Sequence, residues 1–154
     1  MLGSSNPVAG PYFNFMIPEP TGVVAVVAPD EPPLLGLVSR LAPALTGGNA
    51  VIAIASETQP LAAIALAEAI ATADVPGGVV NVLTGLRAEL APWLASHMDV
   101  NAIDVTGADG LAPDLERAAA ENVKRVVHGE ADRQSPWEIA SFLELKTVWH
   151  PIGV

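Results

Sequence analysis

Polar residues that could take part in chemistry lie directly after apolar runs of the chain. The run 22–28 ends in the loop 29–31 (Pro-Asp-Glu), and the run 50–54 ends in the loop 55–59, which contains Ser56. Short, mostly β-branched runs that end in turn residues are typical of strands buried on both faces. Ligands of open α/β sheets bind at the carboxyl ends of the strands, so these two loops are predicted to carry the functional residues.

The remaining residue types offer little further chemistry. The chain contains no cysteine, which excludes disulfides, thiolate metal sites and cysteine nucleophiles. His97 and Asp99 could form an acid–base pair, but their position between a helix and a strand favours an ordinary surface turn. His128 and His150 have neither a Cys nor a third His at ligand spacing, so no metal site is predicted. No catalytic residue is predicted.

The composition fits one acidic domain without a membrane span. A chain of 154 residues can form one domain with its own core. Its formal charge of −10 argues against nucleic acid as a partner, because phosphates need basic residues, and the acidity is interpreted as a solubility feature. No apolar run reaches the roughly 20 residues that span a bilayer. Residues 1–5 lack the basic and apolar segments of a signal peptide, so a cytoplasmic location is expected.

Apolar periodicity predicts alternating strands and helices. Helical spacing over 34–45, followed by Gly47-Gly48, completes a strand–helix–strand unit between the two buried runs. The predicted order continues with a helix at 61–73, a strand at 79–83, a helix at 88–96, a strand at 100–105, a helix at 111–121 and a strand at 123–127. This alternation predicts an α/β fold, a Rossmann-like open parallel sheet of about five strands with helices on both faces.

The two ends of the chain differ from this central domain, which is expected to span residues 19–128. Residues 1–18 contain Gly, Pro and an aromatic patch. They are predicted to be an arm that lies along the domain or, equally, a disordered terminus with docking aromatics. Residues 129–154 are predicted to be a linker followed by a helix and an oligomerisation-type strand. Ser135 is placed to cap this helix, with Glu138 at the capping-box position.

The C-terminal strand is the best candidate for an interaction surface. The helix before it is expected to end at about Leu143, and the strand 146–149 is stopped by Pro151. A short strand after a linker offers free backbone groups to another sheet. The segment Leu145–Trp149 is therefore predicted to pair with another subunit. The alternative is that it folds back on its own domain.

Several motifs resemble the cofactor-binding domain of the NAD(P)-dependent aldehyde dehydrogenase superfamily. They are Glu19-Pro20-Thr21-Gly22-Val23-Val24, Leu41-Ala42-Pro43-Ala44-Leu45, Gly48-Asn49-Ala50-Val51, Ser56-Glu57, the segment from Pro76 to Gly85, the segment from Leu94 to Val100, and Thr106-Gly107. The resemblance implies NAD or NADP as the cofactor. It also implies aldehyde oxidation through a thiohemiacetal on a cysteine of a separate catalytic domain.

The C-terminal segment is similar to the same superfamily. Leu145-Lys146-Thr147-Val148-Trp149 resembles the strand with which aldehyde dehydrogenase subunits pair with a neighbour. The stretch 29–35 and the short step through 122–126 look most like a branch with two tandem modules, in which the second module is shortened and degenerate.

The resemblance implies a cofactor site that is only partly preserved. The family's cofactor-binding positions that still match are Pro29, Glu57, Thr106 and Gly107, with Glu57 at the position that contacts the adenine ribose. Three positions depart from the family: Glu31 replaces an oxyanion-binding amide, Ile54 a ribose-binding lysine and Ala108 a serine at the pyrophosphate. An ionised glutamate would repel an oxyanion instead of donating to it.

These departures favour a truncated, non-catalytic aldehyde dehydrogenase-like domain that acts as a structural or oligomerisation module. It would form a homo-oligomer or join a full-length aldehyde dehydrogenase subunit through Leu145–Trp149. One alternative is a domain that binds NAD or NADP weakly. Another is a subunit of an aldehyde dehydrogenase that a full-length partner completes. Without a thiol, the chain is predicted not to oxidise aldehydes alone.

Overall fold

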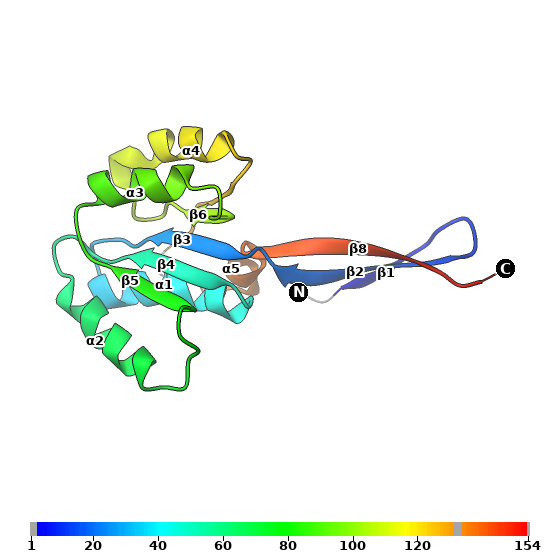
Figure 1. The fold of residues 1–154 in the computed structure, drawn as a ribbon, viewed down its shortest axis with the longest axis horizontal. Helices are drawn as coiled ribbons and strands as arrows, with labels where there is room; N and C mark the ends of the chain where they lie inside the picture. The colour runs from blue at the N-terminus through cyan, green and yellow to red at the C-terminus, as the bar shows by residue number, and fades with distance from the viewer. Residues whose placement is uncertain (1–2, 131–133, 154) are drawn as a thin grey trace.

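The computed structural model describes residues 3–130 and 134–153, which form two β-sheets with their helices (Figure 1). One sheet has five parallel strands and carries helices on both faces. The other has three antiparallel strands and projects from the first as a narrow extension (Figure 1). The α/β part thus contains the packed core, and the extension presents exposed strands.

The five-stranded sheet has the order β5-β4-β3-β6-β7, and all its neighbouring strands are parallel. Its strands are β3 (Val23–Val27), β4 (Ala50–Ile54), β5 (Val80–Leu83), β6 (Ala102–Asp104) and β7 (Arg125–Val127). The chain begins in the middle with β3, moves outward to β5, and then returns to add β6 on the other side. This reversal between β3 and β6 confirms the predicted doubly wound fold.

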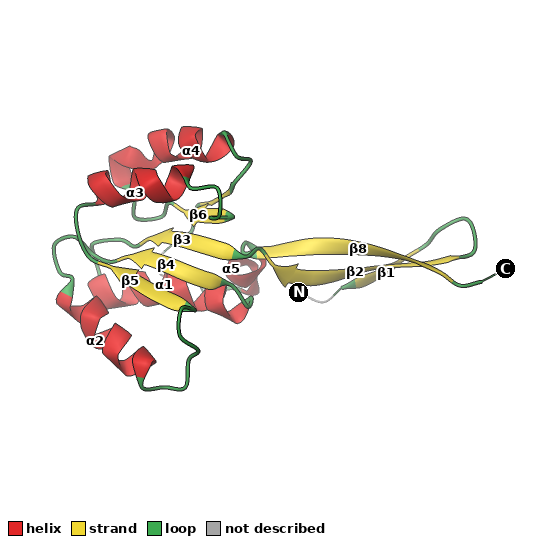
Figure 2. Ribbon diagram, in the orientation of Figure 1, coloured by secondary structure: helices red, strands yellow, loops and turns green. Residues whose placement is uncertain are grey.

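Two helices cover each face of this sheet (Figure 2). The helices α1 (Pro33–Thr46) and α2 (Leu61–Ala71) lie on one face, and α3 (Arg87–Ser96) and α4 (Ala112–Ala120) lie on the other. Successive residues of β3 alternate between two cores: Val26 packs beneath α1, and Val27 packs beneath α3 and α4. Because both faces of β3 are covered, its sequence is apolar throughout.

The limits of several elements differ from the predicted ones. β7 begins at Arg125 instead of residue 123, because Val123 has a left-handed φ of 56° that a strand cannot contain. The helix predicted over 111–121 begins as the 3₁₀ turn η1 (Asp109–Leu111) and continues as α4. β6 covers only three residues of the strand predicted over 100–105.

The projecting sheet has the order β1-β2-β8 and combines the first two strands of the described chain with the last one. Its strands are β1 (Ser4–Asn6), β2 (Tyr12–Pro20) and β8 (Leu143–Pro151). β2 and β8 pair antiparallel along their full length, from Tyr12 opposite Pro151 to Pro20 opposite Leu143. The described part of the predicted arm, residues 3–18, forms strands of this sheet and is not packed along the α/β part, because β2 leads away from it (Figure 1). The domain boundaries expected after residues 18 and 128 stay a prediction.

The C-terminal strand is longer than the sequence predicts. It spans nine residues instead of the four from Lys146 to Trp149, because β2 provides a continuous pairing partner. The helix before it, α5 (Pro136–Ala140), is shorter than predicted. Phe142, which was expected to be helical, is fully buried in the core. Ser135 caps α5 as predicted, since its Oγ accepts a hydrogen bond from the backbone N–H of Trp137 at 3.3 Å.

A buried cation fastens this tail to the α/β part. Arg40 of α1 is fully buried, and its Nε donates to Oδ2 of Asp104 at 2.7 Å. Its Nη1 donates to Oε2 of Glu138 in α5 at 2.6 Å. The guanidinium also lies 5.9 Å from the ring centroid of Phe142. The sequence pattern assigned Glu138 only to a helix cap and gave no sign of this ion triad.

The helices are short compared with a bilayer. The longest, α1, has 14 residues. Within residues 3–130 and 134–153, no helix is both long and apolar enough to cross a membrane.

Candidate functional site

Loops that follow four of the parallel strands meet at the carboxyl end of the five-stranded sheet. The loops after β3 and β6 flank the point where the strand order reverses, and the loops after β4 and β5 lie beside them. In doubly wound sheets this point is where ligands bind. These loops and the helix starts that follow them line a shallow cavity of about 360 Å³, formed by Asp30, Glu57, Arg87, Ala88, Ala108, Asp109, Gly110 and Leu111. We call this cavity the switch-point crevice.

Asp30, in the loop after β3, connects the loops around it. Its Oδ1 accepts hydrogen bonds from Oγ of Ser56 at 3.0 Å and from the backbone N–H of Glu57 at 2.7 Å. The same oxygen lies 2.6 Å from Nη2 of Arg87. Burial alone would raise the pKa of Asp30, but these hydrogen bonds and the charge of Arg87 lower this pKa below its ordinary value. Asp30 is therefore a structural anion that joins the loops after β3, β4 and β5.

Arg87, the first residue of α3, places its guanidinium in the crevice. Only 7% of its side chain is exposed, and its Nη1 lies 3.4 Å from Oδ2 of Asp109. Its backbone N–H donates to Oε2 of Glu57 at 2.8 Å. Although Nη2 is ion-paired with Asp30, neither Nε nor Nη2 makes a hydrogen bond to the residues that the structure describes. The cation is thus fixed more by charge than by directed hydrogen bonds.

Thr106 and Gly107, two of the predicted cofactor-binding residues, form hydrogen bonds within the protein. The backbone N–H of Gly107 donates to the carbonyl of Val27 at 2.9 Å. A Cβ at Gly107 would lie 2.3 Å from the carbonyl oxygen of Ala28, so the loops after β3 and β6 touch at this glycine. The Thr106 hydroxyl donates to Asp104 and accepts from the backbone N–H of Gly129 at 2.9 Å.

The other positions singled out by the family resemblance do not come together in one site. Pro29 packs against Gly36 at the start of α1. The side chain of Glu31 accepts a hydrogen bond from the side chain of Gln59. Ile54 and Ala108 are buried among the apolar residues beneath α3 and α4. Of the four positions that match the family, only Glu57 lines the cavity.

The sequence did not point to Arg87 or Asp30 as a pair. The available signal was one basic residue after the Thr84-Gly85 turn at the carboxyl end of a predicted strand. Nothing local shows that this side chain turns toward the loop after β3, which lies two strands away from β5 in the sheet order. Only the tertiary arrangement brings the two charges together.

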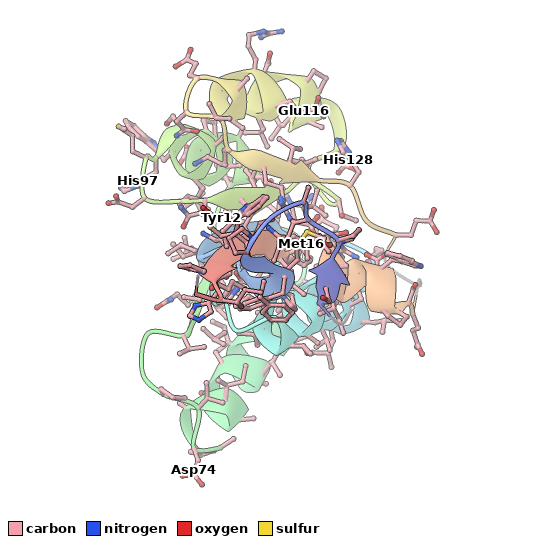
Figure 3. The ribbon with its side chains drawn as sticks, turned by 90° about the vertical axis from the view of Figure 1, so that its right-hand side faces the viewer. Tyr12, Met16, Asp74, His97, Glu116 and His128 are labelled. Carbon is pink, nitrogen blue, oxygen red and sulfur yellow. The ribbon has the colours of Figure 1, made fainter. Side chains whose placement is uncertain are left out.

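The histidines lie apart from the crevice and from one another. His128 is 3.2 Å from Glu116 of α4, whereas His97 lies at the end of α3, on the other side of the molecule in Figure 3. The backbone N–H of Asp99 donates to Nδ1 of His97 at 3.2 Å, as expected for a turn. His150 is opposite Phe13 in the projecting sheet. Across the described residues, no group of three or more His, Cys, Asp or Glu side chains could hold a metal ion.

A doubly wound parallel sheet whose loops gather at the switch point defines the dinucleotide-binding class of α/β domains. Within this class, the chain belongs to the aldehyde dehydrogenase family, whose sequence profile matches residues 1–148.

Comparison with individual proteins agrees with this assignment. The chain is 37% identical over 125 residues to cytosolic aldehyde dehydrogenase 1 of Elephantulus edwardii, covering 80% of this chain and 25% of the relative. It is 40% identical over 114 residues to 2-hydroxymuconic semialdehyde dehydrogenase of Pseudomonas putida, covering 73% of this chain and 24% of the relative.

A similar solved structure is that of betaine aldehyde dehydrogenase from Staphylococcus aureus in complex with NAD+. It superimposes with a TM-score of 0.76 at 27% identity over 80% of this chain and 25% of that one. The chain thus spans about a quarter of the length of the relatives it matches.

Proposed function

We propose that this chain is a non-catalytic assembly module of the aldehyde dehydrogenase family, and that its β8 edge pairs with a second copy of the chain. The observation that carries the proposal is the projecting β1-β2-β8 sheet, in which β8 is an edge strand. The thiohemiacetal route that the family resemblance implies needs a cysteine, and the 154 residues contain none.

The projecting sheet leaves several large apolar side chains exposed to solvent. Its large side chains with more than a third of their surface exposed are Tyr12, Phe13, Ile17, Leu145 and Trp149. Three strands are the smallest number that makes a sheet stable on its own in water. The strand register places Tyr12, Leu145 and Trp149 on one face of the sheet and Phe13 and Ile17 on the other, so both faces expose apolar side chains. Covering the sheet with a partner would stabilise it.

The sequence of β8 is self-complementary about Thr147. In an antiparallel pair of two copies with Thr147 opposite Thr147, Leu145 faces Trp149 and Glu144 faces His150. The apolar pair Leu145–Trp149 is of a kind that stabilises antiparallel strands. The β8 edge has no neighbouring strand among the described residues. A twofold dimer with one continuous sheet follows from this register.

A point substitution tests the pairing better than a truncation, because removing the tail would also remove the buried Phe142. Thr147 is exposed, so Thr147→Lys leaves the monomer intact but places two like charges at the twofold axis. We expect light scattering to show a dimer for the wild-type chain and for Thr147→Val, and a monomer for Thr147→Lys. A wild-type monomer at every concentration would refute the proposal.

A second candidate function is a subunit completed by a full-length aldehyde dehydrogenase, and an apolar groove on α1 favours it. A cavity of about 580 Å³ lies between α1 and α5, and Leu35 and Val38 line both it and a neighbouring cavity of about 480 Å³. Leu35 is 55% exposed. If a full-length subunit covers this groove, Leu35→Glu should abolish co-purification with it. Leu61→Glu, at an exposed position of α2, should not.

A further inference from the structure

The charge of the switch-point crevice does not suit a dinucleotide. Asp30, Glu57 and Asp109 line the crevice together with Arg87, so three carboxylates and one guanidinium leave a formal charge of −2. Asp109 is 83% exposed at the N-terminal end of η1, where the anionic part of a ligand would otherwise bind. A pyrophosphate placed here would be repelled.

Three backbone donors in and after the loop that follows β6 are already paired within the protein. The N–H of Gly107 donates to Val27, that of Ala108 donates to Val105, and that of Leu111 donates to Ala108, each at 2.9 Å. Phosphate-binding loops depend on free backbone N–H groups that point at the ligand. The residues present therefore do not fit the NAD or NADP that the family implies.

The same crevice is suited to a planar cation. The Arg87 guanidinium lies between Asp30 at 2.6 Å and Asp109 at 3.4 Å, whereas Glu57 accepts a hydrogen bond from the Arg87 backbone N–H. Carboxylates placed around a guanidinium are its preferred partners. We infer that the switch-point crevice is a guanidinium-binding site that Arg87 of the same chain fills. Without Arg87, it takes a small guanidinium cation in preference to a dinucleotide.

The guanidinium of Arg87 is attached to α3, which limits how it can be oriented in the crevice. A free guanidinium has no such limit. The Arg87 side chain reaches the crevice from α3, and in this position Nε and Nη2 make no hydrogen bond to a described residue. A free guanidinium of the same size can rotate to direct its N–H groups at Asp30 and Asp109. The Arg87→Ala variant leaves these carboxylates around an opened cavity. A small cation that binds there should restore the ion pairs, and with them the stability, that the substitution removes.

Chemical rescue of the full chain tests this inference. We expect Arg87→Ala to lower the thermal midpoint, and millimolar methylguanidinium chloride to raise it again by roughly 2–4 °C relative to sodium chloride at equal ionic strength. The wild-type chain and Arg117→Ala, which breaks an exposed ion pair with Asp114, should show no such rise. An equal response of Arg87→Ala to both salts would overturn the inference.

Two further measurements keep the test decisive if Arg87→Ala does not fold. In the wild-type chain, nuclear magnetic resonance should show slow rotation of the Arg87 guanidinium, because the two carboxylates hold it by charge, and Asp30→Asn should accelerate this rotation. Free rotation in the wild-type chain contradicts the inference. Calorimetry with NAD should show no binding to either the wild-type chain or Arg87→Ala, and clear NAD binding overturns the cation preference. None of these readouts depends on β8 pairing, so the two proposals can fail separately.

Discussion

Nε of Arg40 lies 2.7 Å from Oδ2 of Asp104, and neither side chain has any exposure to solvent. Burial disfavours a charged guanidinium, but the negative charges of Asp104 and Glu138 and their hydrogen bonds outweigh it and raise the pKa of Arg40. Arg40 is therefore a permanent cation in the core, where it joins α1, β6 and α5.

The first prediction concerns this buried ion pair. Asp104→Ala should lower the free energy of unfolding by about 3–5 kcal/mol, because it leaves Arg40 buried with one of its two carboxylate partners missing. Urea denaturation followed by circular dichroism measures the loss. Arg117→Ala, which removes an exposed ion pair, serves as the control and should change stability by about 0.5 kcal/mol or less. Similar losses in the two variants would show that the buried pair is not important for stability.

The second prediction concerns the contact between the loops after β3 and β6. Gly107→Ala would place a Cβ 2.3 Å from the carbonyl oxygen of Ala28, so one of the two loops must shift. We expect a loss of about 1–3 kcal/mol, as for other overpacked sites, in urea denaturation. Gly110→Ala is the matched control in the same loop, since its Cβ would meet nothing within 4 Å. If both variants are equally stable, the two loops are not in close contact.

The third prediction is a dependence of stability on pH through Asp30. Its pKa is lowered in the folded chain, so its contribution is fully present above the ordinary pKa of 3.8 and is lost as the pH falls through the folded pKa. Urea midpoints of the wild-type chain and of Asp30→Asn should therefore differ most above pH 3.8 and converge at lower pH. A difference that stays constant down to acidic pH would show that Asp30 is not a stabilising anion.

The fold was predictable because its signal is local. The run 22–28 is apolar at nearly every position, and β3 is buried on both faces, so sequence and environment agree residue by residue. The same holds for β4, whose predicted limits 50–54 match those in the structure. The alternation of short strands and helices predicted a parallel sheet, but it did not predict the strand order β5-β4-β3-β6-β7.

The site and the tail were decided only by tertiary structure. Arg87 looked like a residue before a short helix, and its role appeared only when the loops after β3, β5 and β6 met around it. The length of β8 could not be predicted, because the sequence of a strand does not identify its pairing partner. That partner, β2, lies near the opposite end of the chain. Hydrophobic periodicity reports which residues are buried, and it therefore determined the sheet and its helices. Which charges meet, and which N–H groups are already bonded, depends on contacts between distant segments, and only the folded chain decides these.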